Sequence, residues 1–133
     1  MVGETDLKKL LGSLNARLQD GLYVFVTLRE NSIPELLSPR MIFHETEGVT
    51  LIVLQSEAEA FNLDYEFPCR MITLEIHSAL EAVGFIAHIA SKLAEHGMGV
   101  NPVAGFYHDH LFIPSGREKD AMEILKRIAE DAN

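Results

Sequence analysis

Two stretches of this sequence follow the same order of predicted elements: a strand, a connection, a hairpin, a Ser-x-x-Glu tetrapeptide and a helix. The strand predicted over Leu22 to Leu28 corresponds to that over Arg70 to Ile76, and Ser56 corresponds to Ser115. The second stretch has the full order strand–helix–strand–strand–helix, which is typical of ferredoxin-like sandwiches. We therefore expect an α+β protein of two ferredoxin-like (βαββα) halves, each an antiparallel sheet with helices on one face.

The two predicted halves differ in completeness. Between its first strand and its hairpin, the first half lacks the long helix of the second half. With a boundary at Pro68, we expect a degenerate half over residues 1–66 and a better-formed half over residues 67–133. The second half ends without the fourth strand that this fold normally contains. Because an open apolar edge invites aggregation, we expect Leu22 to Leu28, or a neighbouring chain, to cover that edge.

Periodicity and capping patterns predict the helices. Leucines recur at three- and four-residue steps, which predicts an amphipathic helix from Asp6 to Gln19; they are Leu7, Leu10, Leu11, Leu14 and Leu18. Either the first half has lost the helix that the second half contains, or this N-terminal helix covers the same surface of its sheet from outside. Each Ser-x-x-Glu tetrapeptide predicts a capping box that begins a helix. The one at Ser78 begins the longest helix, which we expect to run to about His96 with a core face of Val83, Ile86, Ala90, Leu93 and Ala94. The final helix, after Ser115, is expected to turn Ala121, Ile124, Leu125 and Ile128 inward.

Charge and hydropathy exclude several classes of protein. The net charge is −9, and the eleven Lys and Arg residues are scattered, which argues against nucleic-acid binding and against anionic membranes. No apolar run approaches the ~20 residues of a membrane span, and no signal peptide is evident, so we expect a cytoplasmic protein. Cys69, the single cysteine, excludes an internal disulfide and a Cys-based zinc site and is expected to be a buried small hydrophobe.

The sequence contains none of the common catalytic motifs. It has no Gly-x-Ser-x-Gly, phosphate loop, dinucleotide fingerprint or His-Glu-x-x-His, and Cys69 has no identifiable base partner. We therefore expect no enzymatic activity and no cofactor. His108 and His110 would share a face of a strand, a spacing usable for a metal. Because two ligands are too few, we favour a polar hairpin tip or a subunit contact, with a metal-dependent hydrolase as an alternative.

The junction from His77 to Phe85 is the first candidate binding site. Free N–H groups and the helix dipole favour a carboxylate at a helix start, and Gly84 would allow a ligand to approach the backbone. Alternatively, Ser78 and Glu81 satisfy these donors themselves, and Gly84 lets the helix sit close to the sheet.

Asn101 is the second candidate. It is a polar amide in an otherwise apolar strand, so it must find a hydrogen-bond partner. It either holds a ligand, caps the turn after Gly97 and Gly99, or bonds across the hairpin.

Particular segments within residues 69–131 resemble an ACT domain, the regulatory amino-acid-binding module of many biosynthetic enzymes. They are the strand Met71 to Ile76, the segment Leu80 to Phe85, the segment Leu93 to Gly97, and Asn101. The whole chain also resembles a family of small uncharacterised bacterial proteins with two tandem ACT-like halves, on the segments HSALEAVG, KLAEHG and AGFYHDH.

The resemblance implies a stand-alone, non-enzymatic module that binds or senses a small molecule, an amino acid, and that forms homodimers or higher oligomers. Backbone contacts would come from Gly84 and Phe85, polar contacts from Ser78 and Asn101. The complete set of implied ligand-binding residues is Ser78, Glu81, Ala82, Val83, Gly84, Phe85, Val100 and Asn101. The resemblance implies no metal site. The alternative is a ligand-free oligomerisation or scaffold module.

Overall fold

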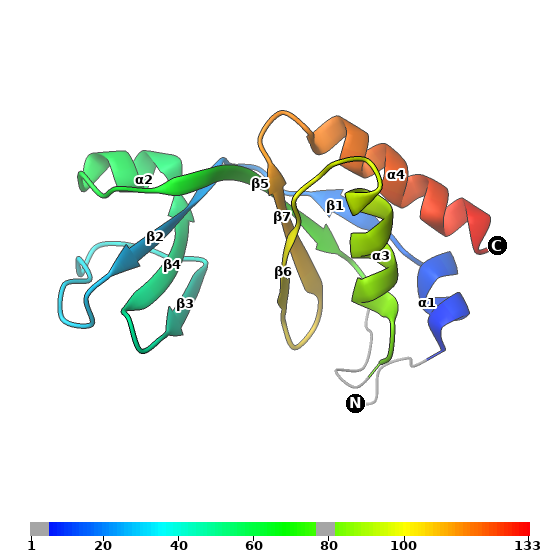
Figure 1. Cartoon of the computed structure of the whole chain (residues 1–133), viewed down its shortest axis with the longest axis horizontal. Coiled ribbons are helices and arrows are strands. Elements are labelled where there is room, and N and C mark those ends of the chain that lie inside the picture. The colour runs from blue at the N-terminus through cyan, green and yellow to red at the C-terminus, as the bar shows by residue number, and fades with distance from the viewer. Residues whose placement is uncertain (1–5, 77–81) are drawn as a thin grey trace. The chain divides into compact units, whose positions relative to one another are not determined.

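The structure is a computed structural model that describes residues 6–76 and 82–133 (Figure 1). In chain order its elements are α1 (Leu7–Gly12), β1 (Ala16–Leu18), β2 (Tyr23–Leu28), β3 (Met41–His44), β4 (Val49–Leu54), α2 (Gln55–Ala60), β5 (Glu66–Leu74), α3 (Phe85–Ala94), β6 (Asn101–Ala104), β7 (Asp109–Pro114) and α4 (Glu118–Asp131). They form two compact units. The larger unit combines the described residues up to Asp20 with those from Arg70 onward, and the smaller unit is Gly21–Cys69.

The smaller unit is built on the strand order β3-β4-β2-β5, to which β5 contributes only its first residues. The pairs β3–β4, β2–β4 and β2–β5 are all antiparallel. Because side chains alternate along a strand, β2 and β4 present one apolar row each to α2 and to the segment that joins β2 to β3. The resulting core consists of Val24, Val26, Leu37, Val49, Leu51, Val53 and Ala58.

The larger unit is built on the strand order β6-β7-β5-β1, with β1 antiparallel to the second part of β5. The helices α1, α3 and α4 pack against one another and over one face of these strands (Figure 1). Their apolar faces and the strands enclose one core, formed by Leu10, Leu11, Leu14, Ile72, Leu74, Phe85, Ile89, Leu93, Met98, Leu111, Ile113, Ala121, Ile124, Leu125 and Ile128. The antiparallel, ferredoxin-like α+β architecture expected from the sequence is confirmed.

The predicted helix from Asp6 to Gln19 is wrong in its second half. Asp6 caps α1 by accepting a hydrogen bond from the Lys9 N–H (3.1 Å), and the helix ends at Gly12. The chain then becomes β1, whose Ala16 and Leu18 pack on the core. A four-residue step between leucines equals two strand periods as well as about one helical turn, so the spacing of the later leucines did not distinguish the two structures.

The fourth strand of the larger unit is β1, which pairs with β5 from Ala16 opposite Leu74 to Leu18 opposite Ile72. The predicted strand Leu22 to Leu28 forms β2 and pairs with only the first part of β5, where Tyr23 faces Cys69. The expected division into residues 1–66 and 67–133 therefore differs from the spatial units. The N-terminal segment belongs with the second half because it supplies the strand and helix that complete that half.

None of the Ser-x-x-Glu tetrapeptides for which the structure describes both ends forms the predicted capping box. Ser56 lies inside α2, and the nearby Glu57 carboxylate instead accepts from the Ser38 N–H (2.8 Å). At the start of α4 the N-cap is Arg117, and the Glu118 carboxylate accepts from the Gly116 N–H (2.7 Å). Neither bond is the one that a capping box predicts, because Glu57 is not the box glutamate and Glu118 bonds the Gly116 N–H rather than the Ser115 N–H.

The longest predicted helix also begins later than expected. Residues 82–84 are not helical, and α3 starts at Phe85 after Gly84, whose φ of 87° lies in the left-handed region. Ser78 and Glu81 lie outside the described residues. The later start changes the buried face: α3 buries Phe85, Ile89 and Leu93, whereas Val83, predicted to be core, is exposed. For α4, by contrast, the predicted core face of Ala121, Ile124, Leu125 and Ile128 is confirmed.

Candidate functional site

A cavity of about 250 Å³ lies in the larger unit between the start of α3 and the hairpin that joins β6 to β7. The α3 side contributes small and apolar residues, and the hairpin contributes the polar ones. Its lining consists of Ala82, Gly84, Phe85, Ile86, Ala87, Ala104, Gly105, Tyr107, His108 and Asp109. A volume of this size is sufficient for a ligand of a few heavy atoms.

The α3 side of the cavity offers backbone donors. The first intrahelical hydrogen bond runs from the His88 N–H to the Gly84 carbonyl (2.9 Å), so the N–H groups of Phe85, Ile86 and Ala87 have no acceptor within the helix. Gly84 has no side chain to cap them, and its left-handed conformation favours glycine over residues with a Cβ. The helix dipole adds partial positive charge at this end, which favours a carboxylate.

The hairpin side offers a carboxylate and a buried imidazole nitrogen. The Gly105 N–H donates to the His108 carbonyl (2.9 Å), and a Cβ at Gly105 would lie 2.8 Å from that oxygen, so the tight turn requires glycine. His108 Nδ1 is buried and has no hydrogen-bond partner among residues 6–76 and 82–133. A buried polar atom without a partner costs about 1–3 kcal/mol. A ligand group that bonds His108 would recover this cost, while Asp109 could accept from a cation.

The structure separates the predicted binding residues into two places. Ala82, Gly84 and Phe85 line the cavity, and because the Phe85 side chain is buried in the core, only its backbone is available there. Asn101 is exposed at the opposite end of β6, where it pairs with Phe112 rather than with the hairpin tip. The expected approach of Asn101 to the start of the helix is therefore not found.

Two further predicted residues that the structure describes, Val83 and Val100, do not line the cavity, and Ser78 and Glu81 lie outside the described residues. Val83 is 83% exposed, and Val100 packs against the core of the larger unit. Sequence reasoning missed Gly105, Tyr107, His108 and Asp109 as cavity residues. The signal was present in the polar residues of the hairpin tip, which we interpreted as a turn or a subunit contact, with a metal-dependent hydrolase as the alternative.

The two histidines considered for a metal lie in different environments. His108 belongs to the turn, whereas His110 lies in β7 with its Nδ1 3.0 Å from Thr73 Oγ1, which in turn accepts from Gln19 Nε2 (3.0 Å). His44 pairs with Glu30 at 2.7 Å in the smaller unit. Within the described ranges, no three His, Cys, Asp or Glu residues gather as a metal site would require.

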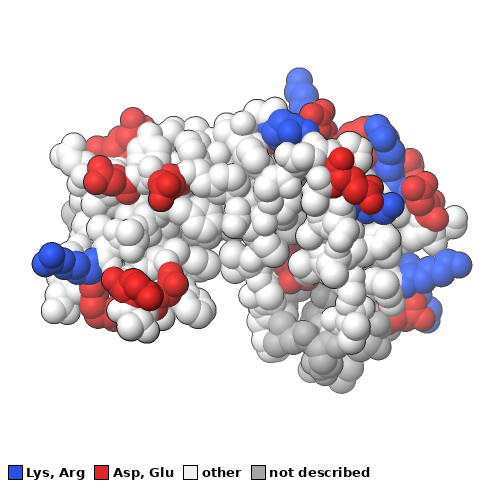
Figure 2. All heavy atoms as spheres, viewed as in Figure 1, with Lys and Arg blue, Asp and Glu red and all other residues white. Residues whose placement is uncertain are grey.

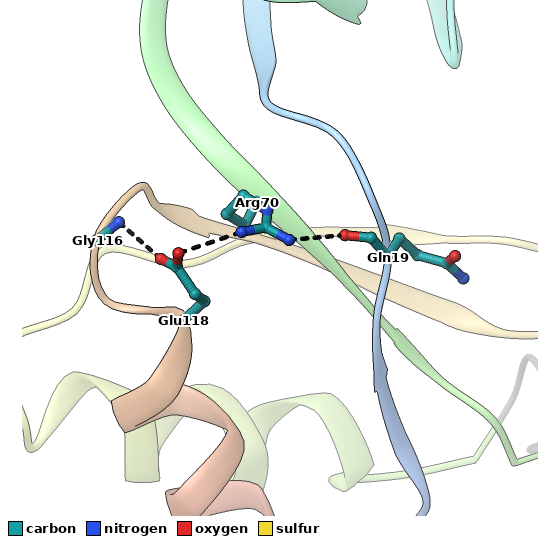
Figure 3. Close-up of polar contacts among 4 residues, drawn as sticks. All are labelled: Gln19, Arg70, Gly116 and Glu118. Carbon is teal, nitrogen blue, oxygen red and sulfur yellow. Dashed lines mark hydrogen bonds and ion pairs between the residues drawn. The ribbon is translucent and has the colours of Figure 1, made fainter.

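Arg70 forms a second polar cluster in the larger unit (Figure 3). Its guanidinium donates to Glu118 Oε2 (3.2 Å) and to the Gln19 carbonyl (3.1 Å), and the Gly116 N–H bonds the other Glu118 oxygen. Hydrogen bonds from its own backbone N–H and from Gly116, together with Arg70, lower the pKa of Glu118. The cluster connects β5, the end of the N-terminal segment and the start of α4, which indicates a structural role.

Cys69 is buried in the smaller unit, and its thiol donates to the Tyr23 carbonyl (3.4 Å). Burial raises the pKa of this thiol to about 12, so the thiolate form needed for nucleophilic attack is scarce at neutral pH. The residue behaves as the small buried hydrophobe expected from the sequence.

Charge is distributed unevenly between the units. The smaller unit has two basic residues, Arg29 and Arg40, against eight Asp and Glu; the other nine Lys and Arg belong to the larger unit, several of them visible in Figure 2. No helix within residues 6–76 and 82–133 has the length and apolar character needed to span a membrane.

Comparison with known proteins places these units in a family. The sequence matches models of the ACT domain over residues 2–70 and again over residues 66–127. No characterised protein matched the chain in a comparison with curated sequences.

Solved structures resemble this one over most of its length. VC0802 from Vibrio cholerae, a protein of unknown function and possible transport protein, is 40% identical with a TM-score of 0.84, covering 92% of this chain and 95% of its own. Atu0741 from Agrobacterium tumefaciens is 17% identical (TM-score 0.74; 87% and 89% covered), and the regulatory subunit of aspartate kinase from Thermus flavus is 10% identical (TM-score 0.63; 85% and 95% covered). The Agrobacterium tumefaciens and Thermus flavus structures share the fold of this chain. The chain belongs to the ACT-domain family and carries two ACT domains in tandem.

Proposed function

We propose that this protein is a non-enzymatic regulatory module that binds a small amino acid in the cavity between α3 and the β6–β7 hairpin. The observation that carries the proposal is the pairing of opposite chemistries across about 250 Å³. Phe85, Ile86 and Ala87, whose N–H groups have no acceptor within α3, line this cavity together with His108 and Asp109 of the hairpin. Membership of the ACT-domain family and the likeness to regulatory subunits of aspartate kinase support a regulatory role.

In the proposed complex, the ligand carboxylate accepts from the first-turn N–H groups of α3, and its ammonium group donates to Asp109. His108 Nδ1 would donate to the ligand carboxylate or accept from its ammonium group, depending on the tautomer of the imidazole. Ser78 and Glu81, which precede Ala82 in the chain, complete the proposed contacts. Val83, Val100 and Asn101 would take part only where a second copy of the chain or a larger ligand extends beyond the cavity.

Thermal unfolding measured with each amino acid in turn tests this function. A ligand at 100 times its dissociation constant stabilises the folded state by about 2.7 kcal/mol, a shift of several degrees for a chain of this size. We expect Asp109→Asn and His108→Ala to abolish the shift, and Asp64→Asn in the smaller unit to retain it. A folded protein whose melting temperature responds to no amino acid would refute ligand binding.

A ligand-free oligomerisation module is the second candidate, and it rests on the edge strand β3. Ile42 and Phe43 of this strand are 48% and 62% exposed, and no proline interrupts it, so the edge is open to pairing with another chain. Sedimentation of the protein and of Phe43→Lys tests this candidate. A dimer that dissociates in the variant, together with no response to amino acids, would favour the scaffold function.

A further inference from the structure

The part of the chain that forms the cavity at the start of α3 is poor in positive charge. Residues 71–116, which include both α3 and the β6–β7 hairpin, contain a single lysine, Lys92, and no arginine. Lys92 lies about two turns into α3, about 10 Å from Phe85 at 1.5 Å per residue, and lines a separate surface groove with residues of α1 and α4. The described lining of the cavity therefore contains neither Lys nor Arg.

The charges that the cavity does offer suit the two ends of an amino acid and leave nothing for an acidic side chain. In the proposed complex the N–H groups of Phe85, Ile86 and Ala87, which have no acceptor within α3, bond the ligand's α-carboxylate. Asp109 of the hairpin bonds the α-ammonium group. A second carboxylate, on the side chain of the ligand, would lie near Asp109 with no Lys or Arg in the described lining to offset the repulsion.

The rest of the lining is small and apolar, with an aromatic ring among the residues that close it. Ala82, Ala104 and Gly105 contribute little or no side chain, so the space between α3 and the hairpin stays open to the ligand. The Tyr107 ring also lines the cavity and contacts Phe106 edge to face, with centroids 5.1 Å apart and 75° between the planes. These two side chains are 63% and 66% exposed, so an apolar group that covers Tyr107 removes apolar surface from water.

We propose that the cavity selects amino acids with a neutral, apolar side chain and rejects aspartate and glutamate. This inference rests on the proposed amino-acid-binding function and names the ligand class of that same site. All amino acids share the α-carboxylate and the α-ammonium group, so the choice among them depends on the side chain. An apolar side chain packs against the alanines and the Tyr107 ring, whereas a carboxylate loses its water without gaining a cation.

Three amino acids of similar shape test the role of charge, because leucine, asparagine and aspartate all branch at the same carbon of the side chain. The titrations are made by calorimetry on the full-length protein at about pH 8, where a histidine side chain in water is uncharged. We expect leucine to bind at least about tenfold tighter than aspartate, with asparagine between them. Because the net charge of −9 repels every anion at long range, the preference should persist in about 0.5 M salt, which screens that repulsion.

A lysine introduced at the cavity provides the matched variant. Ala87 is an exposed residue in the first turn of α3 that lines the cavity, and Ala60 is an exposed residue at the end of α2 in the smaller unit. Ala87→Lys and Ala60→Lys change the net charge by the same amount, and lysine is a good helix former at both positions. We expect Ala87→Lys to bind aspartate at least about tenfold tighter than the wild type, and Ala60→Lys to bind it as the wild type does.

A second pair of variants tests the apolar wall. We expect Tyr107→Ala to weaken leucine binding about tenfold, because the ligand side chain loses the ring that it would cover. Phe43→Ala, which removes an exposed aromatic ring from the smaller unit, should leave leucine binding unchanged. Circular dichroism establishes that every variant is folded.

The outcomes separate the selectivity from the site itself. Aspartate that binds as tightly as leucine, or an unchanged affinity for aspartate in Ala87→Lys, would overturn the proposed selectivity and leave the amino-acid site standing. Unchanged leucine binding in Tyr107→Ala would overturn the apolar wall as the basis of the selectivity. A folded protein that binds no amino acid would overturn both the site and its selectivity.

Discussion

The two units of this protein share a strand order but differ in what covers the strands. In the larger unit, β5 leads into α3, and the candidate cavity lies at the start of that helix. In the smaller unit, β2 leads to β3 without a helix, and Ile33 and Leu37 of the connecting segment pack on the core instead. A loop can therefore replace the helix as a cover for the sheet, but it does not supply a helix N-terminus. This difference explains why the candidate site belongs to the larger unit.

The largest expected effect comes from removing a buried side chain from α3 and from the segment that connects β2 to β3. Ile89→Ala in α3 and Leu37→Ala in the connecting segment each remove a buried side chain, a change that typically costs about 2–5 kcal/mol. We expect Ile89→Ala to lie at the upper end of that range, because a rigid helix cannot close the cavity, and Leu37→Ala at the lower end. Urea unfolding of both variants measures the difference. Equal costs would mean that the loop packs as rigidly as the helix.

The next effect tests the strand that the N-terminal segment adds to the larger unit. The Gln19 N–H donates to the Met71 carbonyl (2.9 Å), and Gln19→Pro removes that donor. We expect a loss of about 1–3 kcal/mol in the free energy of unfolding. Gln19→Ala, which keeps the backbone bond and loses only the side-chain bond to Thr73, should cost less. Equal stability of the proline variant and the wild type would contradict the pairing of this segment with β5.

A smaller effect depends on pH. The pKa of Glu118 is lowered in the folded state, so its contribution to stability is present above the ordinary carboxyl pKa of about 4.3 and is lost as pH falls through the lower folded value. Glu118→Gln should therefore make stability fall less steeply below about pH 4.3. Glu123→Gln, whose carboxylate is exposed in a loose ion pair, is the control. Unfolding midpoints at a series of pH values would show whether the two variants differ.

The smallest effect concerns the start of α3. Val83 is 83% exposed, so Val83→Ser should change the free energy of unfolding by no more than about 0.5 kcal/mol. The sequence pattern, which placed this valine in the core, predicts a much larger loss. A loss of more than about 2 kcal/mol in the free energy of unfolding would indicate that Val83 is buried and that α3 begins before it.

Local sequence patterns correctly predicted the elements whose apolar residues repeat with a single clear period. The strand predicted over Leu22 to Leu28, which forms β2, and the apolar face of α4 are where the sequence placed them. The Ser-x-x-Glu pattern failed as a capping box because Ser56 lies inside α2 and because α4 begins after Arg117 rather than after Ser115. For the site, the sequence pointed to Gly84 and its neighbours. It did not point to His108 and Asp109, because their proximity to α3 depends on how the hairpin folds over the helix start.

The sequence by itself determined the ferredoxin-like class, the duplication, the buried thiol of Cys69 and the acidic character of the chain. These follow from periodicity and composition, which are local or additive properties. Only the tertiary structure decided that the N-terminal segment completes the second half. The leucine spacing of the N-terminal segment is compatible with a helix and with a strand. The segment becomes a strand at Ala16–Leu18 because it pairs there with the edge of β5, more than fifty residues later in the chain. Tertiary contacts also bring the β6–β7 hairpin to the start of α3 and so form the candidate cavity.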